Sequence, residues 1–588
     1  MKKRLSKPRF LLAILMLLLT GLLFTVVLPV CKIRCTSLRF KAFYNELFRQ
    51  EMLSDTLSMH YTLAKPENYG IYHYSPVLYG VEEDSVVTAS SSLERLQEIS
   101  RAQLSPEEQY EYDCLKHTLR LRAALESFEY YIEPCSLNGG SLSNLMILLS
   151  EYSFYREQDV KEYLSLLAQT GKYLEQLMDY EQERDRRGLS YSEEFYQDTA
   201  SISKQLATLA PQLLGTTFST RLEELSLSES KKADYQKKHA VLASKFLSKG
   251  LLTFAEQCSG LGQERTLPLC SLENGRTYYT YLVEYKTGVS ATPETLVRAL
   301  SKDIKTLTGE IKKLFQNYNP SDYALLLEEP KPSLSSDAKA LLASLEQELQ
   351  PYYPKLTNAN PLIKVVSPGM EAISAPAFYL STPIDDTKAS IIYINPESTC
   401  TPLELCTTLA HEGFPGHLYQ DLYQHQARGI WENKLFTLLN FTGYCEAWAL
   451  YNEFSSFSLI ANQAKQQGNP LLADQIQLEA LQRRLSMAVL SLSDILIHYY
   501  GMNQEAMEKT ISGLGYTAQN LEQVYEFLLE NPVYYPTYYV SYLGLLDLRS
   551  HIKEEAGASF TPFLFHSYYL ENGPAPFSLM KGHFSLTE

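Results

Sequence analysis

Apolar residues recur at helical spacing along most of this chain, and this repeat constrains the fold more than any other feature. Residues 160–188 are one example, with apolar side chains three and four residues apart, as on one face of an α-helix. Gly188 is a typical residue for ending that helix. Another helical stretch begins with Thr292, Pro293 and Glu294, which suit a cap, a first position and a first turn. We therefore predict a mainly α-helical protein.

One stretch breaks the helical pattern. Residues 377–396 contain two short runs rich in β-branched and aromatic residues, and the pair Asp385 and Asp386 lies between them. Two such runs around a turn-forming pair are typical of a β-hairpin or a small sheet. The sequence therefore predicts a small β element within an otherwise helical protein.

The first thirty residues combine a basic flank with an apolar run. Lysine and arginine occupy five of residues 1–9, and the next twenty-one residues, 10–30, carry no charge. A run of that length can cross a bilayer as a helix. The basic flank favours a cytoplasmic N-terminus. We therefore predict a single-pass anchor in the cell membrane, with the rest of the chain outside the cytoplasm.

Two alternatives to an uncleaved anchor stay open. The apolar run could belong to a cleaved signal peptide, although it is longer than usual for that role. The sequence LPVC, which ends at Cys31, weakly resembles the site at which lipoproteins are cleaved and lipidated. These alternatives would give a secreted or a lipid-anchored protein. Both still place the bulk of the chain outside the cytoplasm.

Charge and cysteine content exclude some kinds of partner and site. The formal net charge is −16, and such an acidic surface repels phosphate backbones, so we expect no nucleic-acid partner. The nine cysteines include no C-x-x-C pair, which argues against a cysteine-based zinc site. Cys258 and Cys270 are close enough in sequence to form a disulfide in an oxidising compartment, but sequence does not fix the geometry that the bond needs.

The most informative stretch is TPLELCTTLAHEGFPGHLYQ, which begins at Thr401. Thr401 can cap a helix, and Glu404 completes a capping box. That helix would carry His411 and Glu412 in a late turn. Neutral imidazoles are good zinc ligands, and a neighbouring glutamate can take a proton from a water that the metal activates.

A second histidine follows at an unusual spacing. Two histidines at i and i+4 share one helix face, whereas His417 comes six residues after His411. On a regular helix the two rings would point to different sides. Pro415 removes a backbone donor and Gly416 relaxes the backbone, so we expect a bulge that brings the rings together.

A third ligand is expected from a later helix. Glu446 lies in the otherwise apolar run of residues 440–455, where a carboxylate is costly unless it is paired or bound to a metal. Glu453 lies two turns later. Glu453 and Asp421 are the nearest candidates in sequence to accept hydrogen bonds from the ligand imidazoles. His425 has no supporting pattern, and we expect it on the surface.

These segments resemble the bacterial domain of unknown function 885 family, whose signature reads H-E-x-x-P-G-H-x-x-Q and then E-G-W-A-L-Y-x-E. Here the two parts read HEGFPGHLYQ and EAWALYNE. The resemblance extends over most of the chain beyond the anchor. Its further parts are residues 273–296, the strand-like IIYINP with Asn395, the segment SDILIHYYGM with Asp494 and His498, and the blocks 541–549 and 572–580.

The family resembles gluzincin metallopeptidases, which have mostly helical folds around a deep channel. The resemblance implies that His411, His417 and Glu446 hold one zinc ion per chain. It implies that Glu412 is the general base. Ala447 stands where the family usually has a glycine, but this departure leaves the ligand set complete. Ligand type alone would also permit manganese or cobalt.

Other polar residues are weaker candidates. Tyr542 is a candidate catalytic donor to the transition state, as tyrosines are in gluzincins. Asp494 and His498 are four residues apart and share a helix face. That pair could hold His498 toward a developing oxyanion, or it could be a buried polar pair. Tyr278 and Tyr279 are candidates for lining the channel, and Asn395 is a candidate for supporting the site or the substrate.

The combined interpretation is a large helical ectodomain with a central channel and a small β element, preceded by a transmembrane helix. We predict a cytoplasmic flank (1–9), an anchor (10–30), an N-terminal helical half (31–290) and a catalytic zinc-binding half (291–588). The expected function is hydrolysis of peptides by a water that Glu412 activates. A zinc hydrolase of another amide or an ester, and a catalytically silent binding ectodomain, are the alternatives.

Overall fold

The computed structural model describes residues 28–79, 88–132, 135, 140–357, 361–366, 376–386, 390–398, 400–439, 441–513 and 520–584. The described chain is mainly helical, as the apolar spacing predicted. Residues 10–27, which form most of the predicted anchor, lie outside these ranges. Within them, no helix combines the length and the apolar character needed to cross a bilayer.

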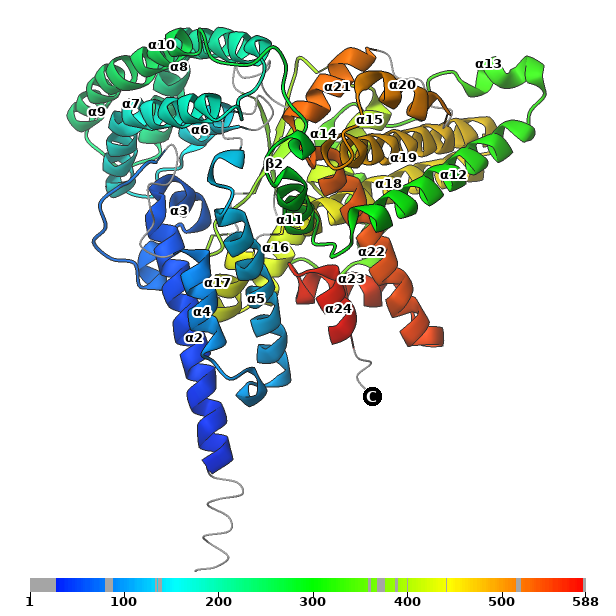
Figure 1. Ribbon diagram of the computed structural model, residues 1–588, viewed down its shortest axis with the longest axis horizontal. Coiled ribbons are helices and arrows are strands. Elements are labelled where there is room, and N and C mark those ends of the chain that lie inside the picture. Colours follow the sequence, from blue (N-terminus) through cyan, green and yellow to red (C-terminus); the bar gives the residue numbers. More distant parts are fainter. Residues whose placement is uncertain are drawn as a thin grey trace, which may run out of the picture.

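The N-terminal helices form two groups (Figure 1). The first group is α2 (Leu28–Ser54), α3 (Thr56–Thr62), α4 (Ala89–Gln97) and α5 (Pro106–Glu126). The second is α6 (Ser141–Glu151), α7 (Glu157–Arg186), α8 (Glu193–Glu223), α9 (Glu229–Leu242), a six-residue π-helix (Ala243–Ser248) and α10 (Lys249–Gln257).

The remaining helices carry the predicted site residues. They are α11 (Gly275–Thr287), α12 (Pro293–Gln316), α13 (Tyr323–Leu326), α14 (Ala338–Leu349), α15 (Pro402–Glu412), α16 (His417–Ala427), α17 (Ile430–Leu439), α18 (Thr442–Gln466), α19 (Pro470–His498), α20 (Gln504–Gly513), α21 (Leu521–Glu530), α22 (Tyr534–Ala556), α23 (Pro562–Asn572) and α24 (Phe577–His583).

Two local signals in the sequence correctly marked helix ends. Thr292 caps α12, where its hydroxyl accepts a hydrogen bond from the backbone N–H of Thr295 at 3.3 Å. At the other end of a helix, Gly188 follows α7 with φ of +69°, a conformation that favours glycine. Short-range chemistry was therefore sufficient to place these boundaries.

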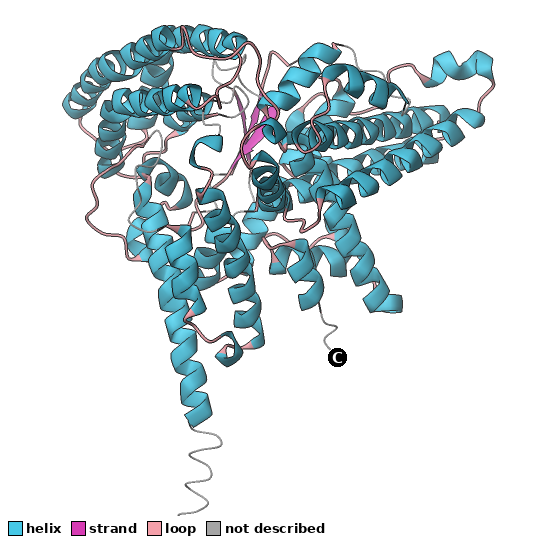
Figure 2. Cartoon of the chain, viewed as in Figure 1, coloured by secondary structure: helices cyan, strands magenta, loops and turns pink. Residues whose placement is uncertain are grey.

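A three-stranded sheet lies near the centre of the molecule (Figure 2). Strand β2 (Ala377–Leu380) pairs antiparallel with β3 (Ile391–Ile394), which confirms the predicted hairpin. Strand β1 (Leu362–Val365) adds a parallel partner on the other edge of β3. The sequence interpretation missed β1, because a single run of four residues is too short to show an alternating pattern.

The sheet separates two buried cores. Successive side chains of a strand point to opposite faces, so Ile392 of β3 packs in the larger core and Tyr393 packs in the smaller one. On β2, Tyr379 packs against the larger core, and Phe378 stacks on Tyr393 with ring centroids 5.0 Å apart. The small β element is therefore the wall between the two cores.

The two cores do not correspond to the two halves that were predicted on either side of residue 290. Helices α6 to α10 build most of the smaller core. The larger core combines residues of α2 and α5 with residues of the C-terminal helices. For example, Phe40 of α2 and Trp448 of α18 are both fully buried in it. Helices from both ends of the sequence therefore support the C-terminal site.

The cysteines of the described chain have free thiols. Cys258 is buried in the smaller core, and burial raises the pKa of its thiol to about 12. The thiol of Cys270 lies 3.5 Å from the carbonyl oxygen of Ile497. The structure therefore contains no disulfide between Cys258 and Cys270.

Candidate metal centre

Two consecutive helices deliver the two histidines. The helix α15 begins with the predicted capping box, in which the Glu404 N–H donates to Thr401 Oγ1 at 3.2 Å and the Thr401 N–H donates to Glu404 Oε2 at 2.7 Å. It ends at Glu412, and α16 begins at His417. The predicted bulge within one helix was therefore wrong, because the helix stops and a new one starts.

Gly416 explains why the chain can turn so sharply between these helices. A Cβ atom at this position would collide with the backbone carbonyl of His411. Only glycine allows the backbone to come this close. The preceding Pro415 offers no N–H for a continued helix. The break turns α16 back toward the end of α15, so His411 and His417 face each other with ring centroids 4.9 Å apart.

Glu446 completes the centre from α18. Its Oε2 atom lies 3.6 Å from His411 Nε2 and 3.5 Å from His417 Nε2. One potential ligand atom from each of the three residues lies within 4.8 Å of the others. Three side chains that are far apart in sequence therefore converge on one point, as the sequence predicted.

The spacing of these atoms fits a tetrahedral zinc site. Zinc bonds of about 2.1 Å in tetrahedral geometry place neighbouring ligand atoms about 3.4 Å apart. The two distances from Glu446 Oε2 to the imidazole nitrogens are close to that value. Moreover, Glu446 Oε2 is buried and accepts no hydrogen bond from any residue that the structure describes. A buried carboxylate oxygen without a donor is costly, and a bound cation would remove that cost.

Glu453 supports the first histidine. It lies two turns after Glu446 on α18, and its Oε2 atom lies 3.1 Å from His411 Nδ1. A carboxylate can only accept, so Nδ1 carries the proton and Nε2 is left to face the centre. Arg483 of α19 forms an ion pair with the other oxygen of Glu453. The prediction that Glu453 orients a ligand thus agrees with the geometry.

The electrostatics of the cluster also favour a cation. Burial lowers the pKa of His411, but contacts with Glu446, Glu453 and Glu412 outweigh it and raise the pKa to about 10. Burial raises the pKa of Glu446, but His417 and His411 outweigh it and lower the pKa to about 2. The carboxylates therefore create a strongly negative potential, which a divalent cation would neutralise.

Glu412 lies beside the three ligands. Its Oε2 atom accepts a hydrogen bond from the backbone N–H of Tyr379 at 3.0 Å. Its Oε1 atom lies 3.9 Å from His411 Nε2. The edge strand β2 thus fixes one oxygen of Glu412, and the other oxygen is next to the centre. This is the position that a general base needs.

Asp421 supports the strand rather than a ligand. Its Oδ2 atom accepts a hydrogen bond from the Tyr379 hydroxyl at 2.6 Å, and its Oδ1 atom lies 3.2 Å from His425 Nε2. Asp421 therefore fixes the residue whose N–H holds Glu412. His425 was expected on the surface, but its side chain is only 10% exposed because it packs against Asp421.

Asn395 stabilises the hairpin. It is buried at the end of β3, where its backbone N–H donates to the Pro376 carbonyl oxygen at 2.8 Å. Its Oδ1 atom accepts a hydrogen bond from the Glu397 N–H at 3.1 Å. These contacts give Asn395 a role in shaping the strand beside the site.

Asp494 and His498 lie in the core, and each bonds to other groups. Asp494 accepts hydrogen bonds from the Tyr279 hydroxyl at 2.5 Å and from the Val533 N–H at 2.9 Å. His498 Nδ1 accepts from the Leu269 N–H at 3.3 Å, and Nε2 donates to the Leu528 carbonyl oxygen at 2.8 Å. Both side chains are fully buried. Of the two roles left open by the sequence, this geometry favours the buried structural one.

Tyr278 and Tyr279, which were candidates for lining the channel, also make structural contacts. Tyr278 is buried, and its hydroxyl donates to the Tyr131 carbonyl oxygen at 3.2 Å. Tyr279 is fully buried against His498, with ring centroids 5.7 Å apart. These tyrosines join α11 to its neighbours, and the central channel stays a prediction.

The contacts of Tyr542 are with groups other than Glu412 and Glu446. Its ring is buried and lies 5.4 Å from the Phe454 ring. The Arg484 guanidinium lies 5.8 Å from the ring centroid on the same side of α22. Burial raises the pKa of Tyr542 to about 12. The positive charge of Arg484 lowers this pKa, and the negative charge of Asp303 raises it. A role as donor to the transition state is therefore better suited to another tyrosine.

Tyr538, one turn earlier on α22, is the tyrosine whose surroundings include the carboxylates Glu446 and Glu412. A Cβ atom at Gly443 would collide with Ser541 Oγ, so α18 and α22 cross in close contact there. Glu446 lies one turn after Gly443, and Tyr538 lies one turn before Ser541. Burial and the negative charges of Glu446 and Glu412 raise the pKa of Tyr538 well above its usual value. The sequence carries no signal that distinguishes Tyr538 from the neighbouring tyrosines of this helix.

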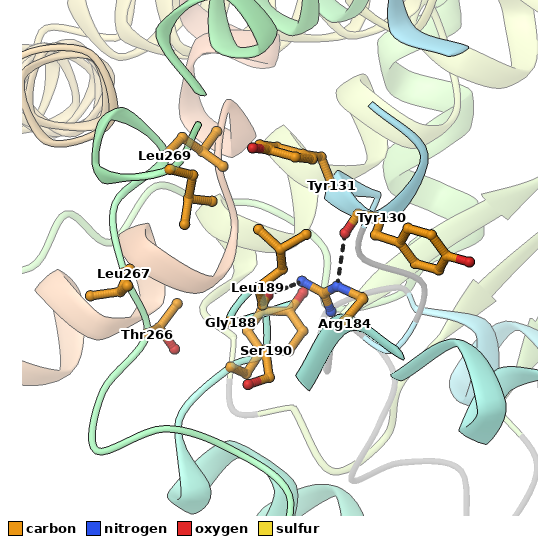
Figure 3. Close-up of a pocket in the computed structure, with 11 residues that line it drawn as sticks. Tyr130, Tyr131, Arg184, Gly188, Leu189, Ser190, Thr266, Leu267 and Leu269 are labelled. Atoms are coloured by element: carbon orange, nitrogen blue, oxygen red, sulfur yellow. Dashed lines mark hydrogen bonds between the residues drawn. The ribbon is translucent and has the colours of Figure 1, made fainter. Parts of the chain in front are cut away.

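A pocket elsewhere in the protein contains none of the site residues (Figure 3). Its charged group is Arg184 of α7, whose guanidinium donates to the Tyr130 carbonyl oxygen at 3.2 Å and to the Leu189 carbonyl oxygen at 2.9 Å. Arg184 also forms a buried ion pair with Glu181 at 2.9 Å. These bonds join α7 to the turn at Glu129–Tyr131 before α6 and to the loop that follows α7, so we assign this pocket a structural role.

The sequence family and the fold can now be compared with known proteins. Residues 80–583 match the family described as bacterial protein of unknown function, DUF885. The chain therefore belongs to the DUF885 family. This match includes the sheet, every residue of the candidate centre and most residues of both cores. No curated protein matches the chain.

Two solved structures resemble this DUF885 chain in fold. One is from Colwellia psychrerythraea and is described as a "putative lipoprotein"; it has a TM-score of 0.76 and 17% identity, covering 93% of this chain and 98% of that one. The other, from Shewanella oneidensis, is described as a "putative lipoprotein of unknown function", with a TM-score of 0.57 and 16% identity, covering 92% and 99%. At these identities the likeness establishes the fold alone.

Proposed function

We propose that this DUF885 protein is an extracytoplasmic zinc metallopeptidase. The observation that carries the proposal is the convergence of His411, His417 and Glu446, with Glu412 beside them. Two imidazoles and one carboxylate leave a fourth position open, which is the ligand pattern of catalytic rather than structural zinc sites. A purely structural site would also not require the adjacent Glu412.

The chain supplies the groups that peptide hydrolysis needs around such a metal. A zinc ion bound by the three ligands would polarise the substrate carbonyl and lower the pKa of water. Glu412 is placed to take a proton at Oε1 and to return it to the leaving amine. Glu453 keeps the His411 imidazole in the required tautomer. The Tyr538 hydroxyl would donate to the oxygen that gains negative charge.

Membrane attachment is part of the same proposal. The uncharged segment 10–30 and its basic flank favour an anchor, with the site outside the cytoplasm. The lipoprotein descriptions of the two structural relatives keep open the second route, lipidation at Cys31. Both routes would hold the enzyme at the membrane surface.

Digestion of a mixed peptide library tests the proposal. The purified, zinc-loaded protein is incubated with the library, and mass spectrometry identifies the cleaved bonds. Glu412→Gln removes the base while keeping the size of the side chain. Glu508→Gln is the matched control, because it makes the same change at an exposed position on α20.

Cleavage by the native protein and by Glu508→Gln, with none by Glu412→Gln, would support the peptidase. It would also reveal whether cleavage is internal or from an end. Absence of cleavage by all three proteins, despite bound zinc, would reject a peptidase. The remaining functions would then be hydrolysis of a non-peptide amide or ester, or binding without catalysis.

A further inference from the structure

Four aromatic rings form a cluster where α21 ends and α22 begins. The Tyr534 ring is the hub, with centroids 5.3 Å from Phe527, 5.2 Å from Tyr535 and 5.4 Å from Tyr538. Phe527 and Tyr535 are also in contact, at 5.9 Å. All four side chains are half-buried. The cluster therefore presents aromatic surface to solvent as well as packing internally.

The cluster begins at the candidate metal centre. Tyr538 lies one turn before Ser541, at the close crossing of α22 with the helix that carries Glu446. Tyr534 lies one further turn away on the same face of α22. The rings therefore extend outward from Tyr538, through Tyr534, to Phe527 on the neighbouring helix.

A neighbouring tyrosine shows that this exposure is not a general property of the helix. Tyr539 is adjacent to Tyr538 in sequence, but it is fully buried. Its hydroxyl donates to Asp303 at 2.5 Å, which is a structural bond to α12. The tyrosines on the two faces of α22 therefore differ in burial. One face packs in the core, and the other leaves its rings accessible beside the centre.

Half-buried rings of this kind suit one class of partner. Aromatic rings gain from edge-to-face contacts with other rings and from burial of their apolar faces. Binding sites for small molecules and peptides combine such surfaces with a few polar groups. Here the polar groups are those of the metal centre, so the apolar surface would bind what lies next to the reacting carbonyl.

We propose that Phe527, Tyr534 and Tyr535 form a subsite for the side chain of a peptide residue next to the cleaved bond, and that this subsite prefers aromatic and large apolar side chains. The inference rests on the proposed peptidase function and names its substrate class. Tyr538 belongs to the centre, and the other three rings set the preference. The protein would then cleave beside phenylalanine, tyrosine or leucine and discriminate against small and charged residues at that position.

Kinetics with paired peptides test the subsite in the full-length, zinc-loaded protein. The two peptides are identical except for phenylalanine or alanine at the position that the library identifies. Tyr534→Ala should raise KM for the phenylalanine peptide about tenfold, a loss typical of an aromatic contact. It should leave kcat and the KM for the alanine peptide within about twofold. Tyr534→Phe keeps the ring and should retain the preference for the phenylalanine peptide over the alanine peptide.

Tyr500→Ala is the control for the loss of a surface tyrosine, because Tyr500 is 46% exposed and its ring contacts Tyr499 instead of this cluster. It should not change the preference. Equal KM changes for the two peptides in Tyr534→Ala, or a native preference for small or charged residues, would overturn the subsite. Loss of the native preference in Tyr534→Phe would also overturn it, since the ring would then be insufficient.

A binding experiment separates failure of the subsite from failure of the proposed function. Calorimetry measures binding of the phenylalanine and alanine peptides to Glu412→Gln, with and without Tyr534→Ala. If the native protein cleaves nothing, tighter binding of the phenylalanine peptide that is lost in Tyr534→Ala would still support the subsite. Equal binding of the two peptides to Glu412→Gln would overturn the subsite whether or not the native protein cleaves peptides.

Discussion

Glu453 Oε2 lies 3.1 Å from His411 Nδ1, and this contact fixes which imidazole nitrogen faces the metal centre. The two residues come from different helices, α18 and α15. Glu453 is almost completely buried, and Arg483 holds its second oxygen. A carboxylate that is costly to bury is thus retained where it can orient a metal ligand.

The first prediction concerns this contact. Glu453→Gln should weaken zinc binding about 10- to 100-fold, because loss of a partner that orients a ligand typically has that effect. Competition with a chromophoric chelator measures the affinity. Glu508→Gln should bind zinc as the native protein does, since Glu508 is exposed on a different helix. An unchanged affinity in Glu453→Gln would show that His411 does not depend on Glu453.

Gly416→Ala should destabilise the protein by about 3 kcal/mol or more, because its Cβ atom would collide with the His411 carbonyl in a rigid turn. Gly215→Ala is the control, since no atom lies within 4 Å of a Cβ atom at that position on α8. Alanine should stabilise that helix by up to about 1 kcal/mol. Chemical unfolding measures both changes. Similar stability of the two variants would contradict the close turn.

The sequence predicted the ligands better than the path of the backbone between them. Residue type and local context identified His411, His417 and Glu446, because few other functions explain a carboxylate in an apolar helix. The break before His417 was missed, since a bulge and a helix end both use proline and glycine. Only the close approach of Gly416 to His411, a contact in three dimensions, separates these possibilities.

Tyr538 and the Asp494–His498 pair show a second limit of prediction from the sequence. Tyr538 and Tyr542 are one turn apart on the same helix, so periodicity cannot decide which one faces the centre. Similarly, the spacing of Asp494 and His498 permits a mutual hydrogen bond, but partners from distant segments bind both side chains instead. Tertiary contacts decide among options that local spacing leaves equal.

Paired tyrosine variants test the assignment on α22. Tyr538→Phe should lower kcat about tenfold or more with little change in KM, because it removes a donor to the developing negative charge. Tyr542→Phe should change kcat less than about twofold, because the contacts of Tyr542 are with Phe454 and Arg484 rather than with Glu446. Steady-state kinetics on one peptide measure both. A larger loss of kcat in Tyr542→Phe than in Tyr538→Phe would reverse the assignment.

Stability should depend on His498 at mildly acidic pH. Burial lowers the pKa of His498 from its usual value of 6.5 to about 4. Between pH 6.5 and pH 4 the unfolded chain therefore binds a proton that the folded chain excludes, so stability falls as pH falls through this range. One such proton contributes about 1.4 kcal/mol per pH unit.

His498→Gln isolates this effect from those of the other histidines. Glutamine can donate to the Leu528 carbonyl and accept from the Leu269 N–H, but it does not titrate. The unfolding free energy of His498→Gln should fall less steeply than that of the native protein between pH 6.5 and pH 4. The two slopes should differ by up to about 1.4 kcal/mol per pH unit, the contribution of one proton. Chemical unfolding at several pH values gives both slopes. Identical slopes for the native protein and the variant would show that His498 does not titrate differently on unfolding.

The most direct test of the central claim is the zinc content of the purified full-length protein beside His417→Ala. The two proteins are equilibrated with the same buffered free zinc, and elemental analysis measures the bound metal. A three-ligand centre predicts about one zinc per native chain and almost none in His417→Ala, with the helical circular dichroism of the two proteins unchanged. Equal zinc content in the two proteins, or no zinc in either, would contradict a metal centre built by His411, His417 and Glu446.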